Sequence, residues 1–170
     1  MSHYKDTHKD LRDLTLCYLV DKEKGLVLIA MKKRGFGVGK LNGVGGKVKQ
    51  DETVIAAMLR ETEEEINVVP KNFEKVAEIR FYSKDNPNDT DMNQIAHVFL
   101  AYTWRGKPEE SEEMAPQWAE IDNLPLEKMW EDDRYWLPKI LDGKKLKASF
   151  LFDDKNIIVN KEVYEVDNFD

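Results

Sequence analysis

The stretch Gly45–Val68, GGKVKQDETVIAAMLRETEEEINV, constrains the fold more than any other part of this chain. It begins with two glycines, and its second half has helical periodicity. At about 100° per residue, one stripe roughly 60° wide is formed by Ile55, Leu59, Thr62 and Ile66. A neighbouring face carries Glu61, Glu64 and Glu65 at i, i+3 and i+4. The sequence therefore predicts a glycine turn followed by a helix over residues 51–66 with three carboxylates on one face.

Clustered carboxylates of this kind predict a cation site. Three like charges on neighbouring turns repel one another and destabilise an isolated helix. A divalent cation relieves that repulsion, and oxygen ligands suit Mg²⁺ or Mn²⁺. Backbone groups of Gly45 and Gly46 lie just upstream, and Arg60 is placed to orient a neighbouring carboxylate by a charged hydrogen bond. The stretch thus predicts a cation held against phosphate oxygens, where it polarises a phosphoryl oxygen and activates water.

Charge is divided unevenly along the chain. Residues 31–50 hold six basic side chains and no acid, whereas residues 51–65 hold six acids and one arginine. Taken alone, such blocks are typical of a solvated face. They also allow a protein with a formal net charge of −7 to bind a small anion locally. The same net charge argues against a sequence-independent grip on long nucleic acid, which needs a basic face.

Length and composition indicate the broad class of protein. The 170 residues suit one domain, so we expect residues 1–170 to fold as a unit, with residues 1–12 as a flexible lead-in. No apolar run reaches about 18 residues, so no membrane span is predicted. The polar N-terminus lacks the apolar core of a signal peptide, and Cys17 has no second cysteine to pair with. Together these features favour a cytoplasmic, reducing setting.

The remaining pattern predicts an α+β fold. Apolar runs bounded by turn residues predict strands at 14–20, 26–31, 76–82, 94–104, 116–121, 146–152 and 157–166. A second helix is predicted over 132–141, with a kink near Pro138. Six of the nine glycines lie between residues 32 and 49, in a loop without the Gly-Lys-Ser/Thr of a Walker phosphate loop. These elements suit a mixed sheet with two helices in αβα layers.

The charged positions of the opening stretch match a known motif. Gly46, Glu52 and the run Arg60–Val68 have the spacing of the Nudix box, Gx5Ex7REUxEExGU, and the sequence resembles that family. Thr62 stands where an aliphatic residue is usual, and Asn67 replaces a glycine. Asparagine tolerates the same left-handed backbone conformation, and neither change removes a charged group.

The resemblance extends over about residues 14–168. The runs at 31–48, 110–114 and 129–141 are similar to the MutT-homologue branch of that family, whose members hydrolyse oxidised purine nucleoside triphosphates. The resemblance implies a Nudix fold, an αβα sandwich with a mixed central sheet and two main helices. It implies a monomer that requires Mg²⁺, with Mn²⁺ as an alternative, and has a small-molecule nucleotide as its partner.

The activity implied is the hydrolysis of substrates such as 8-oxo-dGTP and 2-oxo-dATP to the monophosphate and pyrophosphate, which cleans the nucleotide pool. Another Nudix substrate stays open as an alternative: O6-methyl-dGTP, an unmodified nucleotide, ADP-ribose or a dinucleoside polyphosphate. A non-catalytic sensor on the same scaffold is disfavoured, because all the box glutamates are present.

The resemblance also implies roles for individual residues. The catalytic residues would be Arg60, Glu61, Glu64 and Glu65, with Glu64, Glu65 or Glu113 as the general base. The metal ligands would be the Gly45 carbonyl, Glu61, Glu64, Glu65 and Glu113, supported by Glu52. For Glu113, plain solvated charge is the alternative. The substrate would contact Thr15, Lys32, Phe36, Asn42, Phe81, Met114, Trp118, Trp130, Asp132 and Asp133.

A physical argument supports the base-binding part of this set. Trp130 offers a flat face on which a purine can stack. Asp132 and Asp133 can meet the polar edge of the base and share one proton, because two adjacent carboxylates in an apolar pocket do not both ionise easily. Asn42 can both donate and accept. The alternative is that Asp132 caps the second helix and Trp130 is a core residue.

Overall fold

The computed structural model describes residues 11–170, and within them eight strands form one mixed sheet with two α-helices. The strands are β1 (Arg12–Asp21), β2 (Leu26–Lys32), β3 (Leu41–Asn42), β4 (Val69–Ser83), β5 (Gln94–Arg105), β6 (Met114–Glu120), β7 (Leu146–Phe152) and β8 (Ile158–Glu165). The helices are α2 (Val54–Ile66), α3 (Asp133–Leu141) and two 3-10 turns, η1 (Ile121–Asn123) and η2 (Leu126–Lys128).

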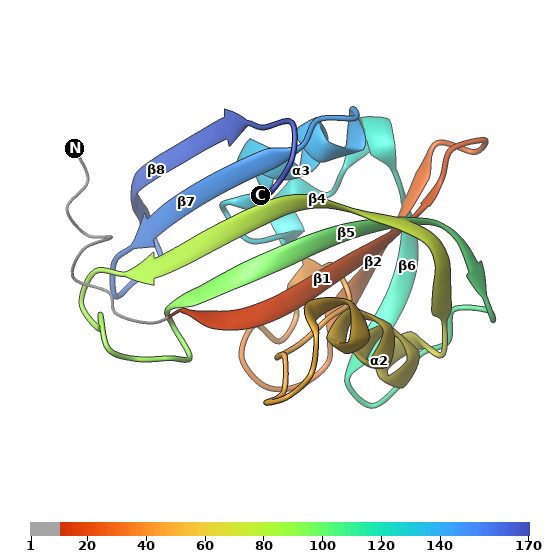
Figure 1. Ribbon diagram of the computed structural model, residues 1–170, viewed down its shortest axis with the longest axis horizontal. Helices are drawn as coiled ribbons and strands as arrows, with labels where there is room; N and C mark the ends of the chain where they lie inside the picture. The colour runs from red at the N-terminus through yellow and green to blue at the C-terminus, as the bar shows by residue number, and fades with distance from the viewer. Residues whose placement is uncertain (1–10) are drawn as a thin grey trace.

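The sheet has the order β3-β2-β1-β5-β4-β7-β8, and β6 pairs with β2 beside this path. The strand pairs β1–β5 and β4–β7 are parallel, and the other pairs are antiparallel. Figure 1 shows α2 on one face of this sheet and α3 on the other. The predicted mixed sheet with two helices is confirmed, and β1 and β2 form an antiparallel hairpin.

Side chains alternate along β1 between two hydrophobic clusters, as the pleat of a strand requires. Cys17 and Leu19 pack with Met58 and Ile66 of α2, in a cluster that we call the α2-side core. Tyr18 packs with Trp136, Leu137 and Ile140 of α3, in a cluster that we call the α3-side core. Because both faces of the sheet are covered, the central strands read as continuous apolar runs in the sequence.

Helix α2 begins later than predicted. Asp51 has φ 66°, outside the helical range, and the Thr53 hydroxyl accepts the amide of Ala56 at 3.1 Å as the N-cap. Ile55, at the start of the predicted stripe, is 49% exposed, whereas Thr62 and Ile66 of the same stripe are buried. The buried Thr62 hydroxyl donates to the Met58 carbonyl at 2.7 Å, so a polar residue at this core position has its hydrogen bond.

Several strands are longer than predicted. The predicted strand 76–82 is the end of β4, whose first half pairs with β5 across β-bulges and carries polar side chains that hid the alternation. Residues 1–10 of the predicted lead-in lie outside the described residues. Arg12 belongs to β1 rather than to a lead-in, and its guanidinium donates to Asp91 at 2.6 Å.

No helix within residues 11–170 is long and apolar enough to cross a membrane.

Candidate functional site

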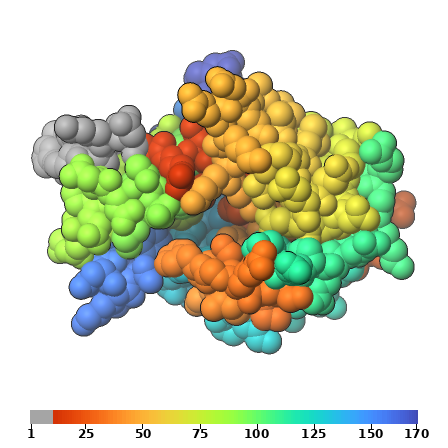
Figure 2. Space-filling view, turned by 90° about the horizontal axis from the view of Figure 1, so that it is seen from below, coloured from red at the N-terminus to blue at the C-terminus, as the bar shows by residue number. Residues whose placement is uncertain are grey.

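One face of the molecule is hollowed beside α2. Figure 2 shows this hollow between the loop after β2 (orange), the segment that leads into α2 (light orange) and the loop between β4 and β5 (light green). The basic and glycine-rich residues 31–50 therefore border the same hollow as the acidic helix. The division of charge seen along the sequence becomes a division between two sides of one site.

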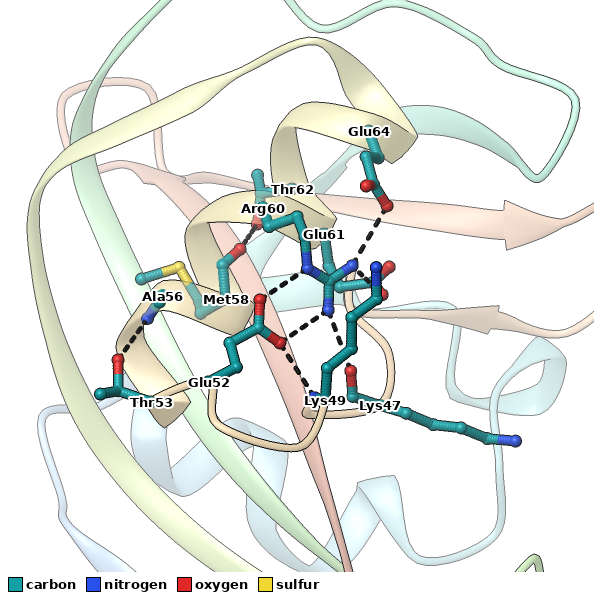
Figure 3. A network of polar contacts seen from close by, with 10 residues as sticks. All are labelled: Lys47, Lys49, Glu52, Thr53, Ala56, Met58, Arg60, Glu61, Thr62 and Glu64. Atoms are coloured by element: carbon teal, nitrogen blue, oxygen red, sulfur yellow. Dashed lines mark hydrogen bonds and ion pairs between the residues drawn. The ribbon is translucent and has the colours of Figure 1, made fainter.

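Arg60 is the centre of the polar network in Figure 3. Its guanidinium donates to both carboxylate oxygens of Glu52, at 2.7 and 2.9 Å. It also donates to Glu61 at 2.8 Å and to Glu64 at 3.2 Å. Arg60 thus binds two box glutamates of its own helix, and this contact is the one that the motif spacing predicted.

The same network fixes the segment in front of the helix. Arg60 donates to the carbonyl of Lys47 at 3.1 Å, and Glu52 accepts the amide of Lys49 at 2.9 Å. The hydrogen bond from Arg60, together with that from the Lys49 amide, lowers the pKa of Glu52 to about 2. Glu52 is therefore ionised and occupied by protein donors, which suits a supporting residue rather than a cation ligand.

Glu65 and Glu61 form a carboxylate pair beneath this network. Glu65 is buried, and its burial, the charge of Glu61 and a hydrogen bond with Glu61 raise its pKa to about 8. The Gly45 amide and the Lys32 ammonium act in the opposite direction but more weakly. Negative charge on Glu65 is therefore disfavoured beside Glu61, and a cation bound between the two carboxylates would favour it.

Two glycines allow the loop to lie against these carboxylates. A Cβ at Gly45 would lie 1.7 Å from the Thr15 carbonyl oxygen, and a Cβ at Gly46 would lie 2.6 Å from the Glu61 carboxylate carbon. Neither position can hold a side chain without displacing its neighbour. The missing Cβ of Gly46 therefore lets the Glu61 carboxylate pack directly against the loop backbone.

The remaining predicted ligands point elsewhere in this arrangement. The Glu113 carboxylate accepts a hydrogen bond of 2.8 Å from the Arg34 guanidinium, and this bond lowers the pKa of Glu113. Glu64 is exposed and accepts a hydrogen bond from Arg60. No three His, Cys, Asp or Glu side chains of residues 11–170 converge as a metal-binding group. The structure thus brings Glu61 and Glu65 together, but it does not bring Glu113 to them, because Arg34 holds its carboxylate. The donors are all oxygens, which is the chemistry that Mg²⁺ prefers.

A second polar group lies at the start of α3. Asp132 and Asp133 are 3% and 2% exposed. Burial raises the pKa of Asp132 to about 6, and the pKa of Asp133 is raised further above its ordinary value by burial and by the charge of Asp132. Asp132 accepts Trp136 Nε1–H at 2.8 Å, whereas Oδ2 of Asp133 has no partner in the described chain. Asp132 stands at the N-cap position of α3, but its side chain makes no capping hydrogen bond and binds Trp136 instead.

Asn42 joins this group through Tyr18. The Tyr18 hydroxyl donates to Asn42 Oδ1 at 3.2 Å, and the Tyr18 ring meets the Trp136 ring edge-on at 6.3 Å. Asp132 and Asp133 are close enough for their charges to raise the pKa of Tyr18, although burial is the larger cause. Tyr18 and Trp136 were not predicted as site residues. The signal was present, because a buried Tyr or Trp needs a partner for its polar tip.

Trp130 faces Phe36 across a stacked contact. Their ring centroids are 5.3 Å apart with planes inclined by 23°, and Phe36 is 69% exposed. The Lys40 ammonium lies 5.6 Å from the Trp130 ring. These three side chains border a cavity of about 700 Å³ that continues toward the turn between β7 and β8. The exposed ring of Phe36 therefore covers one face of Trp130.

The other predicted substrate contacts divide between the two faces of the sheet. Phe81 lies against the α3-side core and stacks on Phe150 at 6.2 Å. Trp118 is paired opposite Leu28, and its ring lies 6.0 Å from Trp104 beside the α2-side core, which also contains Met114. The structure therefore does not bring Trp118 together with the α3-side residues, because strand register places it on the other face.

Comparisons with known proteins agree with this architecture. A family model for the NUDIX domain matches residues 10–140. The oxidized purine nucleoside triphosphate hydrolase of Mus musculus is 42% identical over 143 residues, which are 84% of this chain and 89% of the mouse protein. The protein of the same name from Danio rerio is 40% identical over 155 residues, 91% of this chain and 96% of that protein.

Solved structures show the same fold. The MutT protein of Bacillus halodurans superposes with a TM-score of 0.75 at 19% identity, covering 89% of this chain and 97% of that one. The MutT NUDIX hydrolase of Burkholderia pseudomallei superposes with a TM-score of 0.60 at 27% identity, covering 69% of this chain and 88% of that one.

Proposed function

This chain belongs to the NUDIX domain family, and from that premise we propose that it hydrolyses oxidised purine nucleoside triphosphates to the monophosphate and pyrophosphate. The substrates proposed are 8-oxo-dGTP and 2-oxo-dATP, and the activity removes them from the nucleotide pool. The mouse and fish relatives of about 40% identity carry the name of this activity.

The observation that carries the proposal is the buried polar group on the α3 side. Asp132 and Asp133 are buried and form no ion pair within residues 11–170, and Oδ2 of Asp133 has no hydrogen-bond partner there. Burying such groups costs free energy unless a ligand or a proton satisfies them. A purine edge presents both donors and acceptors, so it can satisfy these two carboxyl groups and Asn42 together. Trp130, next to them in the chain, supplies an aromatic face.

We propose that Glu61, Glu64 and Glu65 hold Mg²⁺ on the α2 side, with the Gly45 carbonyl and with Glu113 once it leaves Arg34. When bound, the cation neutralises phosphate charge and activates water. Arg60 keeps the box carboxylates in place through its four-way network.

Other groups act on the triphosphate and on the proton. Lys32 lies near enough to Glu65 and Glu113 to influence both, and its ammonium attracts the phosphates. The general base is Glu64, Glu65 or Glu113. Thr15 lies behind Gly45, and its buried hydroxyl has no hydrogen-bond partner among the described residues. We propose that it lines the sugar and phosphate side of the site.

The test is a panel of kcat/KM values in the presence of Mg²⁺, measured by pyrophosphate release for the triphosphates and by AMP release for ADP-ribose. The panel contains 8-oxo-dGTP, 2-oxo-dATP, O6-methyl-dGTP, dGTP and ADP-ribose. We expect the oxidised purines to exceed dGTP by at least about tenfold, which corresponds to about 1.4 kcal/mol of discrimination. Absence of pyrophosphate release from every nucleotide would rule out the proposal, and preference for another member would reassign the substrate.

Two further measurements test the catalytic side. Glu65→Gln keeps the shape of the side chain and should lower kcat by at least about 100-fold, because a cation ligand or base is lost. Glu63→Gln is the matched control, since Glu63 is exposed on the same helix outside the network. Removing divalent cations with EDTA should abolish activity, and excess Mg²⁺ should restore it.

We further propose that residues 1–170 act as a single domain, as a monomer in the cytoplasm. The continuous sheet of the described residues supports the single domain. The resemblance to the family supports the monomer, and the single cysteine favours a reducing compartment. Light scattering coupled to size-exclusion chromatography tests the monomer, and a mass near twice 19.8 kDa would contradict it.

A further inference from the structure

The amide of Asn42 is held in one orientation. Its Oδ1 accepts two hydrogen bonds, from the Tyr18 hydroxyl at 3.2 Å and from the Gly43 backbone amide at 2.8 Å. Its Nδ2 has no hydrogen-bond partner in the part of the chain that the structure describes. A side-chain amide with its oxygen occupied in this way has only its NH₂ group left to offer a ligand.

The Tyr18 hydroxyl is fixed and stays protonated. Tyr18 is 0% exposed, in the middle of β1, and its ring lies edge-on to Trp136. Burial and the charges of Asp133 and Asp132 raise its pKa well above the ordinary value, so the phenol keeps its proton and donates. A Cβ at Gly43 would lie 2.7 Å from Tyr18 Cζ, so glycine is what lets this ring reach Asn42.

We propose that Tyr18 is a positioning residue that orients Asn42 as a hydrogen-bond donor toward the bound base. The site then selects bases that present an acceptor to Asn42, while Asp132 and Asp133 meet the rest of the edge. The proposal deepens the proposed function and rests on it, because it takes the ligand to be a purine nucleotide. Tyr18 does not touch the substrate and acts only through Asn42.

A double-mutant cycle on Tyr18→Phe and Asn42→Ala tests this role. Tyr18→Phe removes one oxygen and keeps the buried ring. It should raise KM for 8-oxo-dGTP by about fivefold, the worth of one ordinary hydrogen bond, and leave kcat within about twofold. In the Asn42→Ala background the same change should have no further effect, because the group through which Tyr18 acts is gone.

The matched control is Tyr102→Phe. Tyr102 also donates its hydroxyl to a side chain, to Glu74 at 2.9 Å, but on a different part of the sheet. This variant should leave KM unchanged. If Tyr18→Phe lowers activity equally in both backgrounds, Tyr18 is a core residue only and the proposal fails. Should Asn42→Ala abolish turnover, the same cycle is measured on binding of 8-oxo-dGMP by calorimetry.

A measurement without substrate separates this proposal from the proposed function. In ¹⁵N-labelled protein, the Asn42 side-chain NH₂ signals should be sharp in the native chain and broadened or shifted in Tyr18→Phe. Unchanged Asn42 signals in that variant would overturn the role of Tyr18, whatever the enzyme hydrolyses. A native protein that is inactive on oxidised purines but shows the expected signals would instead overturn the proposed function alone.

Discussion

At the scale of single residues, Arg60 shows why the type of cation matters. Its planar guanidinium contacts Glu52, Glu61 and Glu64 at the same time, together with a backbone carbonyl. A lysine ammonium at the same place is a point charge on a flexible stem and cannot form the paired contact with Glu52. The box carboxylates therefore depend on the shape of Arg60 as well as on its charge.

Arg60→Lys should consequently lower kcat/KM by about tenfold or more and lower the Tm by about 4 °C, because the two-pronged contact is lost. Activity assays and thermal unfolding followed by circular dichroism measure the two effects. Arg34→Lys makes the same substitution in the exposed pair with Glu113 and should leave the Tm unchanged. Equal Tm changes in the two variants would contradict this account.

Trp130 offers a second prediction at the residue scale. Trp130→Ala should raise KM for 8-oxo-dGTP by at least about tenfold, because a stacking surface of this size is lost. Hydrolysis of a simple phosphate-ester reporter without a base should change much less. Comparing the two substrates on one preparation makes the measurement independent of protein quality. An equal loss of activity on both substrates would show that Trp130 stabilises the fold rather than binding the base.

At the scale of elements, the end of α2 decides where the acidic helix stops. Asn67 has φ 60° and ψ 38°, the left-handed conformation, and its amide donates to the Glu63 carbonyl. The glycine that the motif usually has here and the asparagine of this chain both tolerate that geometry. Replacing the usual glycine by Asn67 thus preserves the backbone conformation at the end of α2, although it adds a polar side chain.

Substitutions at Asn67 test this interpretation. Asn67→Ala should lower the free energy of unfolding by about 1 kcal/mol, because alanine is strained at positive φ. Asn67→Gly should change it by only a few tenths of a kcal/mol, since the lost side-chain contact with Glu109 is exposed. Urea unfolding gives both values. An alanine variant as stable as the glycine variant would show that the left-handed backbone has no cost here.

At the scale of the whole molecule, the buried Asp132 lowers the stability of the fold at neutral pH, although the proposed recognition of the base requires it. Asp132 is buried with a pKa raised to about 6, whereas an aspartate in the unfolded chain titrates near 4. Between these values the folded protein binds more protons than the unfolded chain. The contribution of Asp132 to the free energy of unfolding therefore falls as pH rises from about 4 to 6, and it stays low above that range.

Asp132→Asn should remove this pH dependence and keep an acceptor for Trp136. We expect the variant to match the native protein at pH 4 and to exceed its free energy of unfolding by about 2–3 kcal/mol at pH 7.5. Activity on oxidised purines should fall at the same time. Urea unfolding from pH 4 to 8 measures the difference, with exposed Asp122→Asn as the control. A difference that does not change with pH would contradict the assignment.

The strands and the acidic helix were predictable because their signals are local. The period of apolar residues places α2 and most of β1, β2 and β5 to within a few residues, and the spacing from Gly46 to Glu65 identifies the family. Errors occurred where polar residues interrupt a strand, as in the first half of β4, and where a cap moves a boundary, as at Thr53.

The sequence by itself determined the reaction class, because three carboxylates, an arginine and two glycines lie within one turn and one helix, where spacing alone sets their neighbours. Only the tertiary structure decided which side chains outside that stretch contact one another. Glu113 meets Arg34, Tyr18 meets Asn42 and Trp118 turns to the α2 side through the pairing of strands far apart in the chain. Strand register sets those contacts, and it follows from packing of the whole sheet rather than from any local pattern.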